Sequence, residues 1–248
     1  MSAFVLALAA GAVTGLALGA LGGGGSVLAV PALIYLLGFT PAAASTASLA
    51  VVSVTSATAL AAHARAGTVE WRAGAVFAAA GLVPAAAGGA VSGYVPSALL
   101  TGAFAVIAAF AAYRMLRPSA SVREEVPVRP AQVARAGAGL GAVTGVLGVG
   151  GGFLAVPALV NVVGLRMRAA VGTSLLVITV NSLAALLARA GTATRVDWAL
   201  VAPFAGAAIL GAWDGKRLAS RVSGGRLQRI FACVLLVVAL FMLADSVL

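Results

Sequence analysis

Two glycine clusters, Gly22–Ser26 and Gly148–Gly152, hold the residues of this sequence best suited to bind a ligand. Each cluster combines a flexible turn with the start of an apolar helix. Such a helix start exposes unpaired N–H groups and carries about half a positive charge, which suits an anion. Small residues also let helices pack closely, so packing is the alternative role. The residues predicted to line a substrate site here are Gly22, Gly24, Gly25, Ser26, Gly148, Gly150, Gly151 and Gly152.

Hydroxyl and amide side chains lie in the apolar run that follows each cluster. Ser48 occupies the first of these runs, and Thr173, Ser174 and Asn181 occupy the second. Hydroxyl groups in helices often bond back to their own backbone. A carboxamide in hydrocarbon, however, needs partners. We therefore expect these four side chains to contribute to the substrate site.

Ionisable residues inside the apolar runs are scarce. Asp214 lies near Arg217, so an interfacial salt bridge is its expected role, and a proton relay is the minor alternative for His63. The apolar runs carry no His-x-x-His pattern, paired carboxylates or Ser–His combination, so the sequence predicts no enzyme, no metal and no cofactor. The coupling ion, if there is one, is H⁺ or Na⁺. The single cysteine, Cys233, excludes an intrachain disulfide and is expected to serve in packing.

The elements that position these groups are predicted by composition. The chain is 62% apolar and 9% charged, which is typical of a polytopic membrane protein. Its net charge of +10 comes from basic residues in the gaps between apolar runs, which argues against nucleic-acid binding. The predicted helices span 3–21, 26–38, 42–63, 73–93 and 97–116, then 133–149, 152–164, 169–188, 198–219 and 227–247.

The two series of helices are copies of each other. Gly19–Leu33 returns as Gly145–Leu159 at a shift of 126 residues, and Arg65–Thr68 returns as Arg189–Thr192. The sequence therefore predicts two membrane repeats, 1–118 and 133–248. The polar, proline-rich segment 119–132 between them is predicted to be a cytoplasmic linker.

The basic residues also predict how the repeats are oriented. If segment 133–164 crosses the membrane an even number of times, fourteen of the 16 basic residues lie on the cytoplasmic side; an odd number leaves only nine there. The even number is favoured, and it gives the repeats opposite orientations. Segments 26–38 and 152–164 are about 20 Å long as helices, too short to cross comfortably. The predicted fold is all-α: two inverted repeats, each with a glycine-broken segment, re-entrant or a short span, plus three full transmembrane helices.

Several motifs resemble the sulfite exporter TauE/SafE family of membrane transporters. They are the paired glycine clusters, Gly172–Leu175, Val196–Trp198 and Leu227–Phe231. The resemblance implies a multi-pass protein of the inner (plasma) membrane that moves small anions such as sulfite or organosulfonates. We expect alternating access, in which one half rocks against the other around the glycine breaks. A passive anion channel is the alternative function, and an intramembrane enzyme or assembly factor is a more distant one. The sequence does not decide whether the protein forms a homo-oligomer.

The chain departs from the family pattern at two places. Thr46–Ser48 stands where the second repeat has Gly172–Ser174, so the halves are not equivalent. Trp213 and Asp214 occupy positions where small apolar residues are expected.

Overall fold

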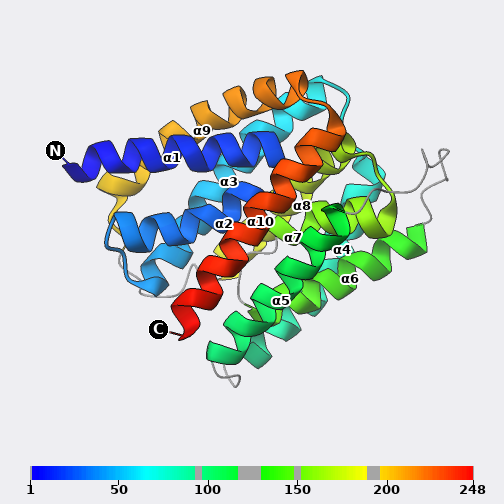
Figure 1. Ribbon diagram of the computed structural model, residues 1–248, viewed down its shortest axis with the longest axis horizontal. Helices are drawn as coiled ribbons and strands as arrows, with labels where there is room; N and C mark the ends of the chain where they lie inside the picture. Colours follow the sequence, from blue (N-terminus) through cyan, green and yellow to red (C-terminus); the bar gives the residue numbers. More distant parts are fainter. Residues whose placement is uncertain (1, 93–96, 117–129, 148–151, 189–195, 248) are drawn as a thin grey trace.

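The computed structural model describes residues 2–92, 97–116, 130–147, 152–188 and 196–247, and these residues form helices without a strand (Figure 1). The first half contains α1 (Ser2–Leu21), α2 (Gly24–Pro31), α3 (Pro41–Arg65), α4 (Trp71–Ser92) and α5 (Ser97–Leu116). The second half contains α6 (Pro130–Leu147), α7 (Gly152–Ala158), α8 (Met167–Ala188), α9 (Trp198–Arg221) and α10 (Gly224–Val247). Each helical segment begins and ends within three residues of its predicted bounds when α2 and α7 are taken together with the π-helical turns that follow them, η1 (Ala32–Leu36) and η2 (Leu159–Val163).

Five helices within the described residues are long and apolar enough to cross a membrane: α1, α3, α8, α9 and α10. Large apolar side chains also face outward from the fold. Val83, Leu187 and Leu210 are more than two-thirds exposed on α4, α8 and α9, which suits contact with lipid. The prediction of a polytopic helical membrane protein is confirmed.

The two short half-helices are built in the same way. Pro31 and Pro157 lack the N–H group that a regular helix needs, and a wider π-helical turn follows each, η1 (Ala32–Leu36) and η2 (Leu159–Val163). Gly38 and Gly164 then end the turns with left-handed φ values of 70° and 86°. The duplicated sequence therefore gives duplicated local structure, down to the residue that stops each half-helix.

The first glycine break forms a helical hairpin. Gly22 has a φ of 72°, a conformation that favours glycine, and the chain reverses direction there. After the turn, Gly25 packs against Leu18 of α1, and Leu33 shares an apolar cluster with Ala7 near the start of α1. The chain thus returns toward the side from which α1 began, as an even number of crossings requires.

Two helix pairs join the halves through direct backbone contact. Gly11, Gly15 and Gly19 of α1 lie at four-residue spacing and face the backbone of α9 at Phe204, Ala208 and Ala212. The second half repeats this arrangement: Gly137 and Gly141 of α6 face the backbone of α4 at Phe77 and Gly81. Both pairs keep a constant register along their length, so the paired helices run parallel. Glycine allows this approach because it has no Cβ.

Two other pairs join equivalent helices of the two halves. Ser56 of α3 meets Thr179 of α8, and further along the pair Thr68, just beyond α3, meets Gly172 near the start of α8. Gln228, near the start of α10, donates to the carbonyl of Met115 at the end of α5. In both pairs, residue numbers rise on one helix as they fall on the other, so equivalent helices run antiparallel. This is the geometry of inverted repeats.

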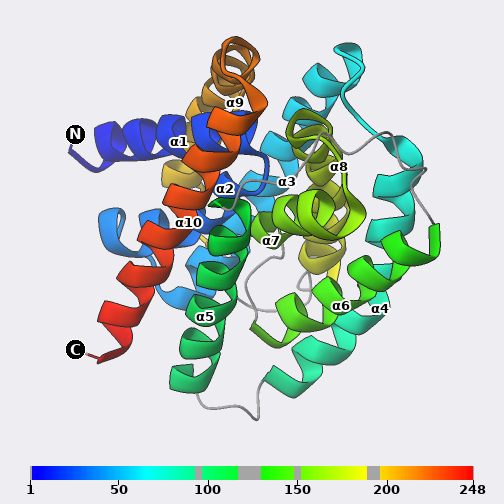
Figure 2. The ribbon, with the colours of Figure 1, turned by 45° about the vertical axis from the view of Figure 1, so that its right-hand side comes forward.

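The described core can be grouped into two interlaced bundles around the glycine-lined pairs, and the two bundles also pack extensively against each other along α3 and α8 (Figure 2). The first bundle contains α1, α2, α3 and α9; the second bundle contains α4, α6, α7 and α8. Each holds three helices of one half and one helix of the other. Helices α3 and α8, and helices α2 and α7, meet where the bundles touch, and α5 packs beside α10. Helices of the two halves are therefore interlaced and not packed as two separate blocks.

Candidate functional site

The turn of the first hairpin lies at the junction of the two bundles. Gly22 is so close to the Ser174 hydroxyl of α8 that a Cβ would collide with it, and Val156 of α7 lies on the same side. Helix α2 begins directly after this turn, at Gly24, and no side chain caps its start. Two residues predicted to line a site, Gly22 and Ser174, are thus brought together from opposite halves.

The hydroxyl groups near this junction already have partners. Ser174 Oγ donates to the Val171 carbonyl of its own helix at 2.8 Å. Thr173 Oγ1 accepts a hydrogen bond from the backbone N–H of Glu70 at 3.0 Å and so holds the loop between α3 and α4 against α8. Contact with an anion would require Ser174 to exchange its hydrogen bond to the Val171 carbonyl, whereas Thr173 holds the loop between α3 and α4.

The other predicted site residues lie elsewhere or outside the described residues. Ser48 donates to the Ser45 carbonyl within α3. Gly25 packs against Leu18 and the Thr14 carbonyl of α1. Gly24 and Ser26 lie in the first turn of α2, and Gly152 begins α7. The remaining predicted glycines lie outside the described residues: Gly148, Gly150 and Gly151.

Two buried oxygen atoms of the described residues have no hydrogen-bond partner. They are Oδ1 of Asn181 on α8 and Oγ1 of Thr55 on α3. The two residues are 126 positions apart, so they are equivalent in the two repeats. Their helices cross next to them, where Thr179 Oγ1 donates to Ser56 Oγ at 2.9 Å. A buried polar atom without a partner is unfavourable, and such atoms are often reserved for a ligand or water. Thr55 was not among the predicted site residues; its equivalence to Asn181 is the signal that identifies it.

A polar cluster that the sequence did not predict surrounds the end of the hairpin. His63 Nε2 lies 3.3 Å from the Gly19 carbonyl, and His63 Nδ1 lies 3.0 Å from Thr68 Oγ1. Lys216 of α9 donates to the neighbouring Ala62 carbonyl at 2.5 Å. Helices α1, α3 and α9 therefore meet in hydrogen bonds one turn before Gly22.

A surface groove of about 450 Å³ lies between α1, η1 and α10. Its lining is mostly apolar, with Thr14 and Tyr35 as the residues that carry a hydroxyl, and Tyr35 and Phe241 meet edge to face within it. An anion would lose most of its hydration there for few donors, so this groove suits an anionic substrate poorly.

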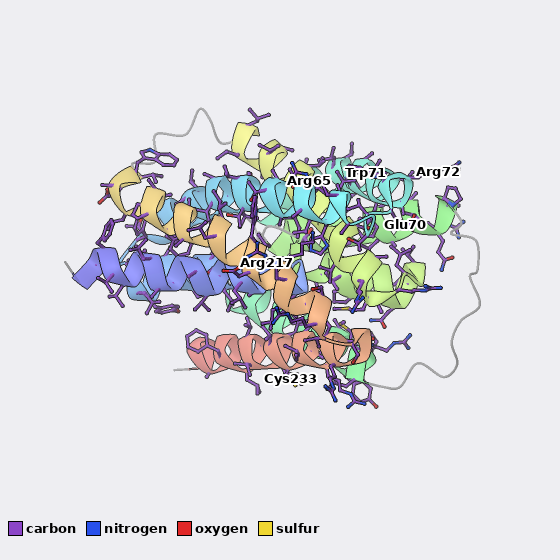
Figure 3. All side chains as sticks on the ribbon, turned by 90° about the horizontal axis from the view of Figure 1, so that it is seen from above. Arg65, Glu70, Trp71, Arg72, Arg217 and Cys233 are labelled. Atoms are coloured by element: carbon purple, nitrogen blue, oxygen red, sulfur yellow. The ribbon has the colours of Figure 1, made fainter. Side chains whose placement is uncertain are left out.

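The charged side chains around the loop between α3 and α4 point outward. Arg65, Glu70, Trp71 and Arg72 are exposed around this loop (Figure 3). Among the described residues, no three or more His, Cys, Asp or Glu side chains are grouped to hold a metal. Cys233 is exposed on α10, so its expected role in packing is wrong. That part of α10 faces outward, and an apolar run alone does not distinguish a face turned to lipid from one turned to protein.

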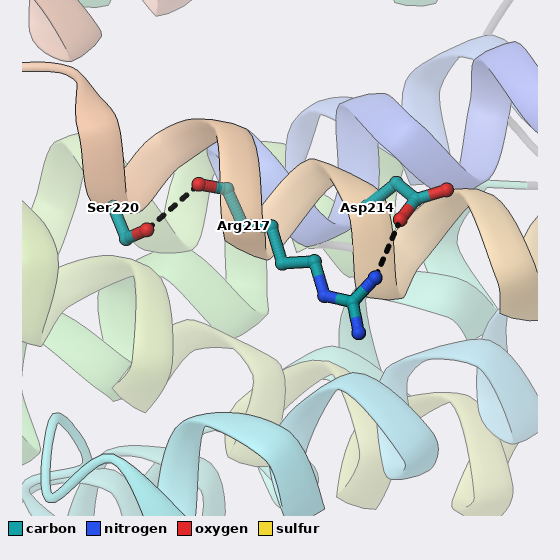
Figure 4. Close-up of polar contacts among 3 residues, drawn as sticks. All are labelled: Asp214, Arg217 and Ser220. Atoms are coloured by element: carbon teal, nitrogen blue, oxygen red, sulfur yellow. Dashed lines mark hydrogen bonds and ion pairs between the residues drawn. The ribbon is translucent and has the colours of Figure 1, made fainter.

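The salt bridge expected at Asp214 is present. Arg217 Nη1 lies 3.4 Å from Asp214 Oδ1 (Figure 4). The side chains are 76% and 68% exposed, for Arg217 and Asp214 respectively, so the pair is a surface feature of α9. Asp214 does not point into the core where a coupled ion would pass.

Comparisons with known proteins agree with this architecture. The model of the family described as "Sulfite exporter TauE/SafE" matches residues 7–242. A "Probable membrane transporter protein" of Xylella fastidiosa strain 9a5c is 34% identical over 99% of this chain and 97% of its own length. A protein of the same name from strain Temecula1 is 33% identical over the same shares. No solved structure matches the chain. The chain therefore belongs to the sulfite exporter TauE/SafE family and is a multi-pass transporter of the cell membrane rather than an enzyme.

Proposed function

We propose that this transporter carries small anions, namely sulfur oxyanions or organosulfonates, by alternating access. The observation that supports the proposal is the contact between Gly22 and Ser174. It joins a glycine turn of one half to a hydroxyl of the other, directly before a helix start that no side chain caps. Backbone N–H groups and a hydroxyl are the donors that a sulfonate or sulfite oxygen needs, and the partial positive charge of the helix start favours the anion.

The two interlaced bundles are the moving bodies in this proposal. Within each bundle, backbone lies against backbone along a glycine-lined helix pair, so the paired helices cannot slide without collision. Between the bundles, helices α3 and α8 cross through small hydroxyl side chains instead. Rocking of one bundle against the other would open the junction at Gly22 alternately to the two sides of the membrane.

Asn181 and Thr55 are proposed to extend the anion pathway along this crossing. Asn181 lies about two helical turns beyond Ser174 on α8, since a turn holds about 3.6 residues. Thr55 lies about two turns beyond Ser48, the equivalent position on α3. Their unpartnered oxygen atoms provide polar surface that the packed core does not use. A hydrated anion, or the water that accompanies it, would satisfy both.

The experiment is flux of sulfite and methanesulfonate into proteoliposomes that contain the purified transporter. Ser174→Ala should lower the flux roughly tenfold, the effect expected for one lost hydrogen bond to a charged ligand. Ser182→Ala is the matched control, because Ser182 is equally buried on α8 and bonds to the Ile178 carbonyl of its own helix. Unaltered flux in Ser174→Ala, or flux that does not saturate with anion concentration, would contradict the proposal.

A further inference from the structure

His63 connects the hairpin to the rest of the junction. It is the only histidine of the sequence, and its side chain is 6% exposed near the end of α3. One ring nitrogen contacts the carbonyl of Gly19, in the last turn of α1 before the hairpin turn. The other contacts the hydroxyl of Thr68, in the loop that leads to α4.

The partners of this ring satisfy it with or without a second proton. Nε2 faces a carbonyl, so it donates in either state. In the neutral ring, Nδ1 accepts a hydrogen bond from the Thr68 hydroxyl. In the protonated ring, Nδ1 donates to the same oxygen, and the hydroxyl turns its hydrogen to the His63 carbonyl, which lies 3.1 Å away. The Thr68 hydroxyl therefore acts as a two-way partner, and no hydrogen bond is lost when a proton binds.

The surrounding charges would make a bound proton depend on an anion. Lys216 is the charged side chain that approaches the ring from α9, and its amino group donates to the Ala62 carbonyl. Helix α1 carries no ionisable residue. Arg65 and Glu70, on the flanking loop, are exposed to solvent. On α8, Arg168 donates to carbonyl groups at the end of α9. Within the described residues, a positive ring beside Lys216 thus has no buried carboxylate next to it, and an anion held at Gly22 would neutralise the added charge.

The same ring spans the border between the two bundles. His63 belongs to the first bundle, and the Thr68 loop, which is held to the His63 carbonyl by the Thr68 N–H and hydroxyl, also contacts α8 of the second bundle. A Cβ at Gly172 would lie 2.6 Å from the Thr68 carbonyl oxygen, and the Glu70 N–H donates to Thr173. The hydrogen bond between His63 and Thr68 is therefore a joint between the bodies that the proposed transport cycle moves.

We propose that His63 is the proton-binding residue of this transporter, and that it takes up a proton together with the anion. Protonation reverses the hydrogen bond across the border, and the anion at the hairpin compensates the charge. This proposal rests on the proposed function. It makes the transported unit one proton with one anionic charge, so the coupled step moves no net charge.

The test uses proteoliposomes that enclose a pH-sensitive dye, with methanesulfonate as the probe because it stays ionised throughout the physiological pH range. A gradient of methanesulfonate should drive protons in the same direction through the wild-type protein. In His63→Gln, anion flux should persist while proton movement falls at least about tenfold, the loss expected when the group that carries the proton is removed. Proton movement at the wild-type rate in His63→Gln would overturn the proposal.

Thr68 variants give a second, milder test that does not remove the ring. Thr68→Val should shift the pH at which flux is half-maximal, because Nδ1 loses its two-way partner, and Thr68→Ser should restore it. Thr58→Val is the control, since the Thr58 hydroxyl bonds only to the Thr55 carbonyl of its own helix. An unchanged pH profile in Thr68→Val would contradict the coupling. Absence of anion flux in the wild type at every pH would instead contradict the proposed function.

Discussion

The two kinds of helix contact in this transporter differ in what separates the helices. Between α1 and α9, and between α4 and α6, glycines bring backbone against backbone. Between α3 and α8, the hydroxyl groups of Ser56 and Thr179 meet across the crossing, beside buried apolar side chains of both helices. A contact of backbone against backbone has no side chains that can change rotamer, so we expect it to stay fixed. A contact through small hydroxyls can exchange one partner for another. The comparison separates the rigid parts of the molecule from the part that can move.

The largest effect should come from filling a glycine contact. Gly15→Ala places a Cβ against the Ala208 carbonyl, and Gly141→Ala places one against Gly81. Overpacking of this kind destabilises a fold by about 1–3 kcal/mol. The unfolding temperature of the detergent-purified protein should fall for both variants. Gly139→Ala is the matched control on α6, because nothing lies within 4 Å of a Cβ there. Equal stability of Gly139→Ala and Gly141→Ala would show that the glycine contact between α4 and α6 is not tightly packed.

The next effect concerns the hairpin turn. Gly22→Ala and Gly38→Ala both force alanine into a left-handed conformation, which costs about 1–2 kcal/mol. At Gly38 nothing lies near a Cβ, whereas at Gly22 the Cβ meets the Ser174 hydroxyl. We therefore expect Gly22→Ala to lose most of its methanesulfonate flux, and Gly38→Ala to lose stability but keep its flux. Similar flux in the two variants would assign Gly22 to packing alone.

The unpartnered oxygen atoms of Asn181 and Thr55 predict the opposite effect on stability, because their removal should stabilise the fold. Asn181→Leu and Thr55→Val remove a buried polar atom that has no partner, a feature that costs about 1–3 kcal/mol. The variants should unfold at the same or a higher temperature while their flux falls. Gain of stability together with loss of flux is the signature of a group retained for transport. Lower stability with normal flux would show that these side chains serve packing.

The smallest effect is expected at the surface of α9. Asp214→Asn breaks the ion pair with Arg217, which is exposed and therefore worth less than about 1 kcal/mol. Flux and its pH dependence should match those of the wild type. A variant that loses its pH dependence would place the proton pathway at Asp214 instead of His63.

Much of the fold follows from local features of the sequence. The hydrophobic runs, prolines and glycines determine where each helical segment starts and stops, so the segments were predicted within three residues, although the change from α-helix to π-helical turn after Pro31 and Pro157 was not. The excess of basic residues on one side predicted opposite orientations, and the antiparallel contact of α3 with α8 agrees with it. The ion pair between Asp214 and Arg217 was predicted correctly because residues three apart lie on one face of a helix.

The pairing of helices could not be predicted from the same features. Nothing in a hydropathy pattern states that α1 packs along α9 instead of its neighbours in sequence. The four-residue spacing of Gly11, Gly15 and Gly19, repeated at Gly137, Gly141 and Gly145, was the available signal for close helix contact. It identifies a packing face without naming the partner. The partners of His63 could not be predicted for a related reason, because its contact with the Gly19 carbonyl joins residues 44 positions apart.

The division into interlaced bundles is tested most directly by distances between spin labels, with the native cysteine removed by Cys233→Ser. Val13, Val83 and Leu210 are exposed positions on α1, α4 and α9. Val13 and Leu210 belong to opposite halves but to the same bundle, whereas Val13 and Val83 share a half and lie in different bundles. Adding sulfite or methanesulfonate should change the distance between labels at Val13 and Val83 and leave that between Val13 and Leu210 unchanged. The reverse result would mean that the halves move as bodies and would contradict the account.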